Sequence, residues 1–216
     1  MTPFLDNSLD PAVRGFLHSP QSPNHRALIL AHGAGGNANA PLLVAIAETF
    51  SAHGYTVLRS DLPFRQLKSF GPPFPALAAR DRAGLRNAVA VMRKQVSGDV
   101  FLGGHSYGGR QSTMLCADEP DLVSGLLLLS YPLHPPRRPE QLRTQHLPNL
   151  RTPSLFVHGT RDPFGSIAEM EKALALVPAK HQLLEVEGGA HDLGFKGKSA
   201  ADLPIRIFTK FEGMFK

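Results

Sequence analysis

Short apolar runs alternate with longer segments of helical periodicity along most of this 216-residue chain. The apolar runs have the length of buried strands, and in the longer segments apolar residues recur every three or four positions. The predicted strands are 27–31, 55–60, 99–103, 122–130, 154–158 and 182–186. The predicted helices are 41–50, 76–96, 108–118, 167–177 and a last one that begins near 204. This alternation predicts the α/β class: a mostly parallel sheet with helices on both faces.

Three segments do not follow this pattern. Residues 1–25 are rich in Pro, Asn and Ser, and within them 13–18 is predicted to be a short edge strand. Residues 62–75 form a proline-rich loop, and 131–152 form a linker that is too short to hold a folded cap domain. We therefore predict one domain over residues 1–216, with 1–25 as an N-terminal edge segment and no cap domain.

The segment after the predicted strand 99–103 has the pattern Gly-x-Ser-x-Gly, with the serine at Ser106. A strand before this pattern and a helix after it are the context in which a sharp turn raises a serine Oγ above the sheet edge. Glycine at 104 and 108 fits such a turn, because the strained backbone leaves no room for side chains there. The alternative is a glycine-rich turn with an incidental serine, since short motifs recur by chance. The flanking strand and helix favour a nucleophile.

A serine nucleophile needs a base to take its proton, and that base needs an acid to orient it. Of the ten histidines, His191 is the candidate base because it follows the last predicted strand in a glycine-bearing loop. Asp162 follows the preceding strand and is the candidate acid. Its alternative role is the N-cap of the next helix, with proline at the first helical position. Asp61 and Asp192 are the fallback acids. All these loops follow strands, so we expect them to gather at one sheet edge.

A tetrahedral oxyanion needs preorganised hydrogen-bond donors. The backbone N–H of Tyr107 is available at the start of a predicted helix, and that of Ala34 lies in the glycine-rich loop 32–37. This loop is alternatively a phosphate cradle, although it has neither the Gly-Lys-Ser/Thr ending of a P-loop nor a Gly-x-Gly-x-x-Gly pattern. His32 and His158 each precede a glycine at a strand end, which suits a role in loop geometry better than the role of base. His105 is expected to point away from the serine.

The order Ser106, Asp162, His191, preceded by His-Gly-Ala-Gly-Gly at 32–36, resembles the α/β-hydrolase superfamily. The resemblance covers nearly the whole chain from about residue 26. The build without a cap is similar to dienelactone-hydrolase-like proteins, and more so to a small family of predicted hydrolases that includes a testis-expressed member. The resemblance implies Ser106 as nucleophile, His191 as base, Asp162 as acid, and the amides of Ala34 and Tyr107 as oxyanion hole. Dienelactone hydrolases carry cysteine where Ser106 stands, so the sequence favours a generic ester or thioester over a dienelactone.

The composition, with 42% hydrophobic and 19% charged residues, is typical of a soluble globular protein. No apolar run reaches the ~18 residues of a membrane span. Residues 1–10 contain two acids and no basic segment, so a signal peptide is not predicted. The single cysteine, Cys116, excludes an internal disulfide, fits a reducing compartment and is predicted to be a packed core thiol. We expect a cytoplasmic protein.

The formal net charge is +5, and Arg137, Arg138, Arg143 and Arg151 form the densest basic cluster. Such a cluster attracts an anionic substrate or nucleic acid, or it is an ordinary solvated surface. The sequence favours the solvated surface, and no nucleic-acid-binding motif accompanies the charge.

These observations predict a serine hydrolase that acts on a small carboxylic ester without metal or cofactor and has no nucleic-acid partner. Arg65, Lys68 and Phe74, in the proline-rich loop, are candidates for shaping the substrate pocket. A second hypothesis is an α/β-hydrolase fold kept as a non-catalytic interaction module, because fold does not imply function. A serine peptidase or acyltransferase is a third hypothesis, and the absence of an insertion large enough for a cap or propeller disfavours a selective peptidase.

Overall fold

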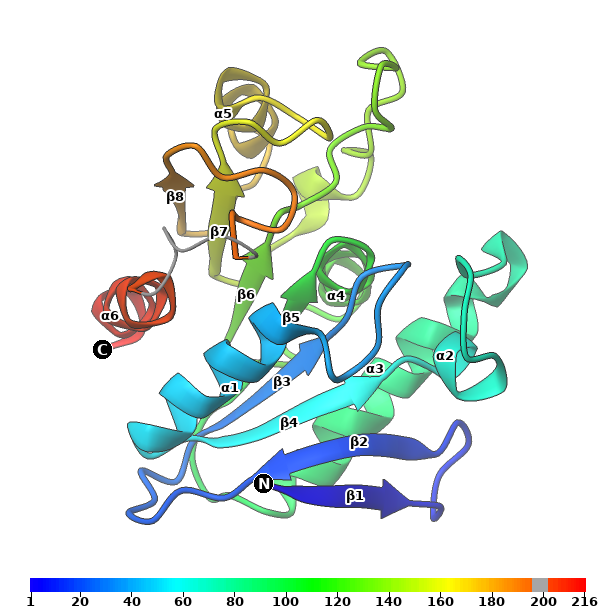
Figure 1. Ribbon diagram of the computed structural model, residues 1–216, viewed down its shortest axis with the longest axis vertical. Coiled ribbons are helices and arrows are strands. Elements are labelled where there is room, and N and C mark those ends of the chain that lie inside the picture. Colours follow the sequence, from blue (N-terminus) through cyan, green and yellow to red (C-terminus); the bar gives the residue numbers. More distant parts are fainter. Residues whose placement is uncertain (196–201) are drawn as a thin grey trace.

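The computed structural model describes residues 1–195 and 202–216. Its centre is an eight-stranded sheet in the order β1-β2-β4-β3-β5-β6-β7-β8 (Figure 1). The strands are β1 Thr2–Asp6, β2 Val13–His18, β3 Ala27–Ala31, β4 Thr56–Asp61, β5 Val100–His105, β6 Gly125–Leu129, β7 Ser154–Gly159 and β8 His181–Val186. β2 pairs antiparallel with β1 and with β4, and every other pair in the sheet is parallel. The predicted mostly parallel sheet is confirmed.

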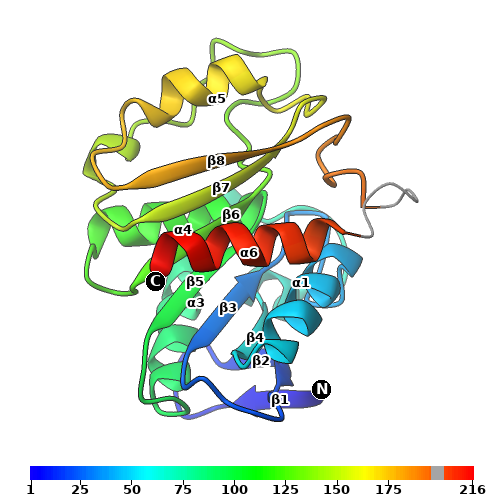
Figure 2. The same ribbon diagram turned by 90° about the vertical axis from the view of Figure 1, so that its left-hand side faces the viewer.

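Helices cover both faces of this sheet (Figure 2). They are α1 Pro41–Ala52, α2 Pro63–Leu67, α3 Ala78–Arg93, α4 Tyr107–Asp118, α5 Ile167–Leu174 and α6 Leu203–Phe215. α1 and α6 pack on one face with Leu28 and Leu30 of β3, while α3 and α4 pack on the other with Ala27 and Ile29. Alternate residues of a strand point to opposite faces, so a strand covered on both sides is apolar throughout.

The N-terminal quarter differs from the prediction. Residues 13–18 do form β2, but β2 lies inside the sheet because β1 pairs along its outer side. β1 contains Pro3 and Asp6 and is largely exposed, so the sequence gives it little strand signal. The loop 62–75 holds the short helix α2, which begins at a proline in the first helical position.

Other boundaries are shorter than the periodicity predicts. The segment 76–96 divides into a 3-10 turn at Pro75–Leu77 and α3, which ends at Arg93. β6 occupies only the second half of 122–130, and α5 ends at Leu174 rather than at 177. The linker 131–152 contains a 3-10 turn at Leu147–Asn149 and no cap domain. Apolar side chains continue past the helix ends into packed turns, which is why the pattern overestimates these lengths.

The parallel strands bring their carboxyl ends to one edge, and two of the loops there meet closely. A Cβ placed on Gly159, at the end of β7, would overlap the carbonyl oxygen of Gly189 in the loop after β8. The amide of Arg161 donates to that same carbonyl at 2.8 Å. The approach that glycine permits at these two positions therefore sets the loop that carries residue 162 against the loop that carries residue 191.

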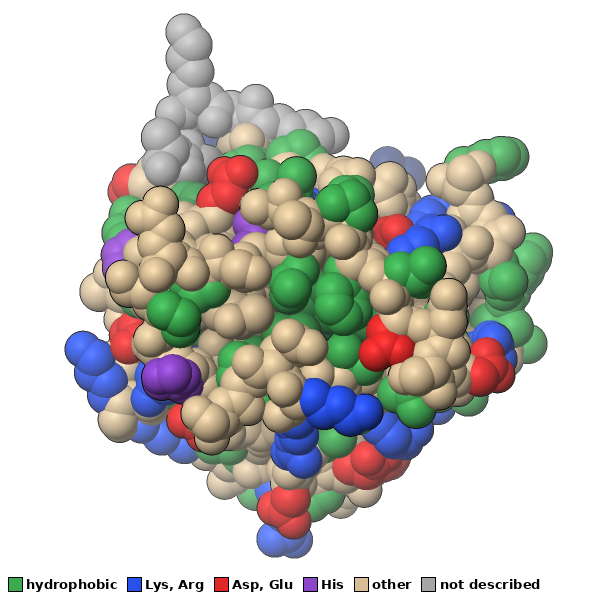
Figure 3. Space-filling model, turned by 90° about the horizontal axis from the view of Figure 1, so that it is seen from below, with side chains coloured by type: hydrophobic (Ala, Val, Ile, Leu, Met, Phe, Trp, Pro, Cys, Tyr) green, Lys and Arg blue, Asp and Glu red, His purple; other side chains and the backbone are tan. Residues whose placement is uncertain are grey.

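The fold bears on two further predictions, that Cys116 is a packed core thiol and that the chain has no membrane span. Cys116 is buried in α4, and burial raises the pKa of its thiol to about 12. Within residues 1–195 and 202–216, no helix combines the length and apolar character needed to cross a bilayer. On the face shown in Figure 3, Lys and Arg side chains are interspersed with acidic ones around a hydrophobic centre.

Candidate active site

Ser106 stands at the turn between β5 and α4 in a strained backbone conformation, with φ 52° and ψ −114°. Positive φ is rare for a residue with a side chain and marks stored strain. The turn is held by hydrogen bonds from the amide of Ser106 to the Leu129 carbonyl (2.8 Å) and from the amide of Gly108 to the His32 carbonyl (3.1 Å). A Cβ on Gly108 would lie 2.7 Å from the carbonyl oxygens of Ala31 and His32. The two glycines of the motif are thus required because α4 and β5 lie directly against β3.

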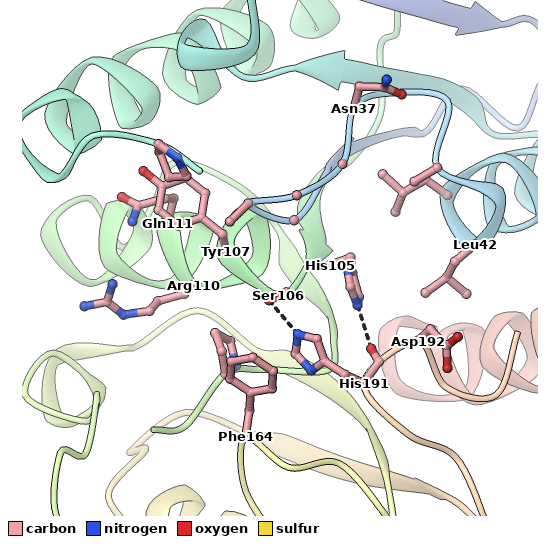
Figure 4. A pocket seen from close by; sticks show the side chains of 18 of the residues that line it. Asn37, Leu42, His105, Ser106, Tyr107, Arg110, Gln111, Phe164, His191 and Asp192 are labelled. Carbon is pink, nitrogen blue, oxygen red and sulfur yellow. Dashed lines mark hydrogen bonds between the residues drawn. The ribbon is translucent and has the colours of Figure 1, made fainter. Parts of the chain in front are cut away.

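The side chains of Ser106, His191 and Asp162 form one continuous chain of hydrogen bonds, and Figure 4 shows the link between Ser106 and His191. His191 Nε2 lies 2.8 Å from Ser106 Oγ. His191 Nδ1 lies 2.8 Å and 3.0 Å from the two carboxylate oxygens of Asp162. A carboxylate facing Nδ1 fixes the proton on that nitrogen, which leaves Nε2 free to accept the serine proton. The three residues proposed from the sequence are brought together in the geometry of a nucleophile, a base and an orienting acid.

The Asp162 carboxylate is fully buried, and its position excludes the alternative role of N-cap. Its Oδ1 accepts the amide of Phe164 at 2.9 Å within the same turn. α5 begins further on, and Ser166 caps it with a full capping box. The fallback acids are bonded elsewhere: Asp61 accepts the amide of Ala38, and Asp192 accepts that of Gly194.

Two residues that the sequence did not single out hold His191 in place. His105 Nε2 donates to the backbone carbonyl of His191 at 2.7 Å, and the two rings are 5.0 Å apart. Burial lowers the pKa of His105 to about 4, so this ring is neutral at physiological pH. The ring of Phe164 stacks on the His191 imidazole at 4.1 Å. His105 thus contacts the backbone of the candidate base, a role that the sequence analysis did not predict.

Ala34 and Tyr107 both line the cavity in front of Ser106. Within the described residues neither amide donates a hydrogen bond, so both are available to a ligand. Tyr107 is the first residue of α4, where a helix leaves its N–H groups unsatisfied. The phenol of Tyr107 donates to the buried Asp81 carboxylate of α3 at 2.7 Å.

The prediction that Arg65 shapes the substrate pocket is wrong, because Arg65 does not line the cavity. It is buried behind the loop 32–37, where its guanidinium donates to the carbonyls of Ala34 (2.9 Å), Gly36 (2.8 Å) and Gly71 (2.9 Å). The imidazole of His32 braces the same loop, with Nδ1 bonded to the Gly33 carbonyl at 2.8 Å. These contacts fix the orientation of the peptide that carries the Ala34 amide.

The cavity at Ser106 has a volume of about 1030 Å³. Glycines of the loop after β3, the first turn of α1 and the loop around His191 form part of its wall. Apolar side chains in this wall are Leu42, Leu43, Met114, Phe164 and Phe195. Lys68 and Phe74 do not line it; the Lys68 ammonium lies over the exposed Phe74 ring, 4.1 Å from its centroid. The proline-rich loop contributes Pro73 and Pro75 instead.

Arg143 also departs from the prediction of a solvated basic surface. Arg137 and Arg138 are exposed, but Arg143 is only partly exposed and lines the cavity together with Arg110 of α4. Sequence reasoning placed Arg143 in a linker, and its distance from the Ser106 motif gave no sign that the linker folds back over α4. In the part of the chain that the structure describes, no group of three His, Cys, Asp or Glu side chains could hold a metal ion.

A mostly parallel sheet, with a strained serine between a central strand and the following helix, defines the α/β-hydrolase fold. Residues 24–209 match the family model described as an alpha/beta hydrolase domain, and the chain belongs to that family.

Solved structures with the same fold span the whole chain. An alpha-beta serine hydrolase homologue from Coxiella burnetii has a TM-score of 0.76 at 18% identity, with 97% of this chain and 98% of that one covered. A dienelactone hydrolase from Anabaena variabilis has a TM-score of 0.75 at 20% identity, with full coverage of both chains. A serine hydrolase without a lid from Xanthomonas campestris has a TM-score of 0.77 at 15% identity, with 99% and 94% covered. This chain thus shares the fold of hydrolases that have no lid.

Proposed function

We propose that this protein is a serine hydrolase that cleaves a small carboxylic ester or thioester through an acyl-enzyme. The observation that carries the proposal is the hydrogen-bonded chain from Asp162 through His191 to Ser106 Oγ, with the serine opening onto a large cavity. Membership of the alpha/beta hydrolase family supports hydrolase chemistry in general. The name of one structural neighbour, a dienelactone hydrolase, is consistent with cleavage of an ester bond.

In the proposed acylation step, Ser106 Oγ attacks the carbonyl carbon while His191 Nε2 takes the hydroxyl proton. Asp162 keeps the other proton on Nδ1 and stabilises the imidazolium. The tetrahedral oxyanion accepts hydrogen bonds from the amides of Ala34 and Tyr107, which donate to no other group among the described residues. The imidazolium then gives its proton to the leaving alkoxide or thiolate, and the acyl group remains on Ser106.

Deacylation repeats these steps with water as the nucleophile. His191 takes a proton from the water, hydroxide adds to the acyl carbonyl, and the proton returns to Ser106 Oγ as the acid departs. One water is consumed, and one acid and one alcohol or thiol are released. The volume of about 1030 Å³ is at the upper end of small-molecule sites, so the cavity accommodates an acyl group and a leaving group together.

Two further inferences concern the domain organisation of the enzyme and its location in the cell. We infer that the chain works as one domain, because the two hydrophobic cores are the two faces of a single sheet. We also infer a cytoplasmic location, because the single cysteine is a buried thiol and gives no sign of an oxidising compartment.

The test is covalent labelling with a fluorophosphonate, which reacts with activated serines. We expect the wild-type protein to be labelled, and the Ser106→Ala and His191→Ala variants to take no label. Ser130→Ala is the matched control: Ser130 is also buried at the end of a central strand with φ 52°, but its Oγ has no hydrogen-bond partner among the described residues. It should label like the wild type. Folded wild-type protein that takes no label would refute the proposal and favour the non-catalytic interaction module.

A series of p-nitrophenyl esters of increasing acyl length then measures turnover and sizes the acyl part of the cavity. Release of p-nitrophenol should be lost in Ser106→Ala and kept in Ser130→Ala. Equal release by Ser106→Ala would show that another group hydrolyses the ester.

A further inference from the structure

Two arginines line the cavity that contains Ser106, and neither has a carboxylate partner. In the described part of the chain, no Asp or Glu oxygen lies within 4.0 Å of the side-chain nitrogens of Arg110 or Arg143. The Nε–H of Arg110 is buried and has no hydrogen-bond acceptor among the described residues. A buried donor on a charged group costs free energy until an acceptor reaches it. The cavity thus contains positive charge that the protein itself does not neutralise.

The groups around these arginines do not compensate the charge. Burial, and then the charge of Arg110, lower the pKa of Arg143, and the same two causes lower the pKa of His146 to about 4. The neutral His146 is bonded to the Thr113 hydroxyl at 2.8 Å. Arg143 donates one hydrogen bond to the carbonyl of Pro132 at 3.2 Å. The two arginines therefore lie close enough to repel each other, and a bound anion would relieve that repulsion.

The position of Arg110 relates this charge to the reactive serine. Arg110 follows Ser106 by four residues on α4, which is about 6 Å along the helix axis and on the same side. Figure 4 shows its guanidinium on the other side of Ser106 from His191. Asp192, the acidic side chain in the cavity wall, lies beyond His191, away from Arg110. The cavity is therefore basic on one side of the serine and not on the other.

We propose that Arg110 and Arg143 form a subsite for an anionic group, carboxylate or phosphoryl, on the substrate of this hydrolase. The preferred substrate is then an ester or thioester with a negative charge a few carbon atoms from the scissile carbonyl. The planar guanidinium fork matches both anions, and a charged fork that reaches an anion gives charge-assisted hydrogen bonds. This inference rests on the proposed serine hydrolase function, and it defines the substrate class of that site.

The experiment compares esters that differ only in the charged end. Monoethyl adipate carries a carboxylate, diethyl adipate is its neutral counterpart, and an ethyl ester with a phosphonate at the same position represents the phosphoryl group. Ethanol release is followed with wild type, Arg110→Gln, Arg143→Gln and Arg138→Gln. Arg138 is the matched control, because it belongs to the same basic cluster as Arg143 but is exposed and does not line the cavity.

We expect the wild type to prefer an anionic ester over the neutral one, in kcat/KM, by roughly 10-fold or more. Arg110→Gln and Arg143→Gln should each reduce that preference by about 10-fold, and Arg138→Gln should leave it as in the wild type. Arg110→Lys should restore part of it, since it keeps the charge but not the fork. The better of the two anionic esters distinguishes carboxylate from phosphoryl. Equal kcat/KM for neutral and anionic esters in the wild type would overturn the subsite and leave the serine hydrolase proposal intact.

A binding measurement on a variant that cannot turn over tests the subsite independently of hydrolysis. Calorimetric titration of Ser106→Ala with monoethyl adipate and with the phosphonate ester should show binding of at least one, lost when Arg110→Gln is added. Absence of any binding by the folded Ser106→Ala protein would also overturn the subsite. Thermal melting of each variant separates loss of folding from loss of the anion contact.

Discussion

Replacing Asp162 with asparagine tests the role of the acid with almost no change of shape. Oδ1 of Asp162 accepts the Phe164 amide at 2.9 Å, so the amide oxygen of an asparagine should occupy that place. Its NH₂ group then faces His191 Nδ1, where the carboxylate oxygen lies 2.8 Å away in the wild type. A donor in that position forces the imidazole proton onto Nε2. Nε2 would then donate to Ser106 Oγ and could no longer take its proton.

The expected loss is large because the wrong tautomer removes general-base catalysis altogether. A decrease in kcat of about 10⁴-fold is the known size of this effect in a Ser-His-Asp enzyme, equivalent to a barrier about 5 kcal/mol higher. The rate of fluorophosphonate labelling should decrease in parallel. The assay is turnover of a p-nitrophenyl ester together with a labelling time course and a thermal melt.

Asp192→Asn is the control, because Asp192 is adjacent to His191 and its contact with the Gly194 amide survives in an asparagine. We expect its kcat to remain within about threefold of wild type. If Asp162→Asn kept more than about one tenth of the wild-type kcat, the acid role derived from the hydrogen-bond chain would be wrong. A loss confined to Asp192→Asn would identify the fallback acid as the functional one.

Three further predictions concern the frame of the site. Gly108→Ala should destabilise the fold by about 1–3 kcal/mol in chemical denaturation, because its Cβ would lie 2.7 Å from backbone oxygens. Gly213→Ala is the control: this glycine of α6 has open space around it, so the substitution should be neutral or stabilising. Equal effects of the two substitutions would contradict the close approach at Gly108. Arg65→Met leaves four loop carbonyls without their donor, so we expect the unfolding free energy to fall by about 1–3 kcal/mol and kcat to fall as the loop that carries Ala34 loses its support. An unchanged kcat would show that this support does not matter for catalysis. His105 has a folded pKa of about 4 against an ordinary value of 6.5, so the unfolded state binds more protons between these pH values and the stability that this ring contributes should be lost as pH falls from about 6.5 to 4. His105→Gln should flatten that part of the melting-temperature profile, and an identical profile would refute a buried neutral ring.

The class of fold and the order of the reactive residues could be predicted from the sequence alone. Short apolar runs such as 27–31 and 100–102, which alternate with segments of helical period, predict strands covered on both faces, and strands connected by helices are parallel. The glycines on either side of Ser106 follow from the local geometry of one turn. Local periodicity and turn chemistry are properties of neighbouring residues, so the sequence records them directly.

Contacts between residues far apart in the chain could be seen only in the three-dimensional structure. His105 and Phe164 hold His191, and Arg65 braces the loop that carries Ala34, but nothing in the local sequence of these residues distinguishes them from packing or surface residues. Arg143 lies in a segment with little regular structure, and it reaches the cavity only because that segment folds back over α4.

The same limit applies to the N-terminal edge. β1 lies against β2 through backbone hydrogen bonds, which any sequence can form, so its residues carry little sign of the pairing. Side-chain patterns encode which face of an element is buried. Which loops meet, and which charges are left without a partner, depends on distances that the folded chain alone sets.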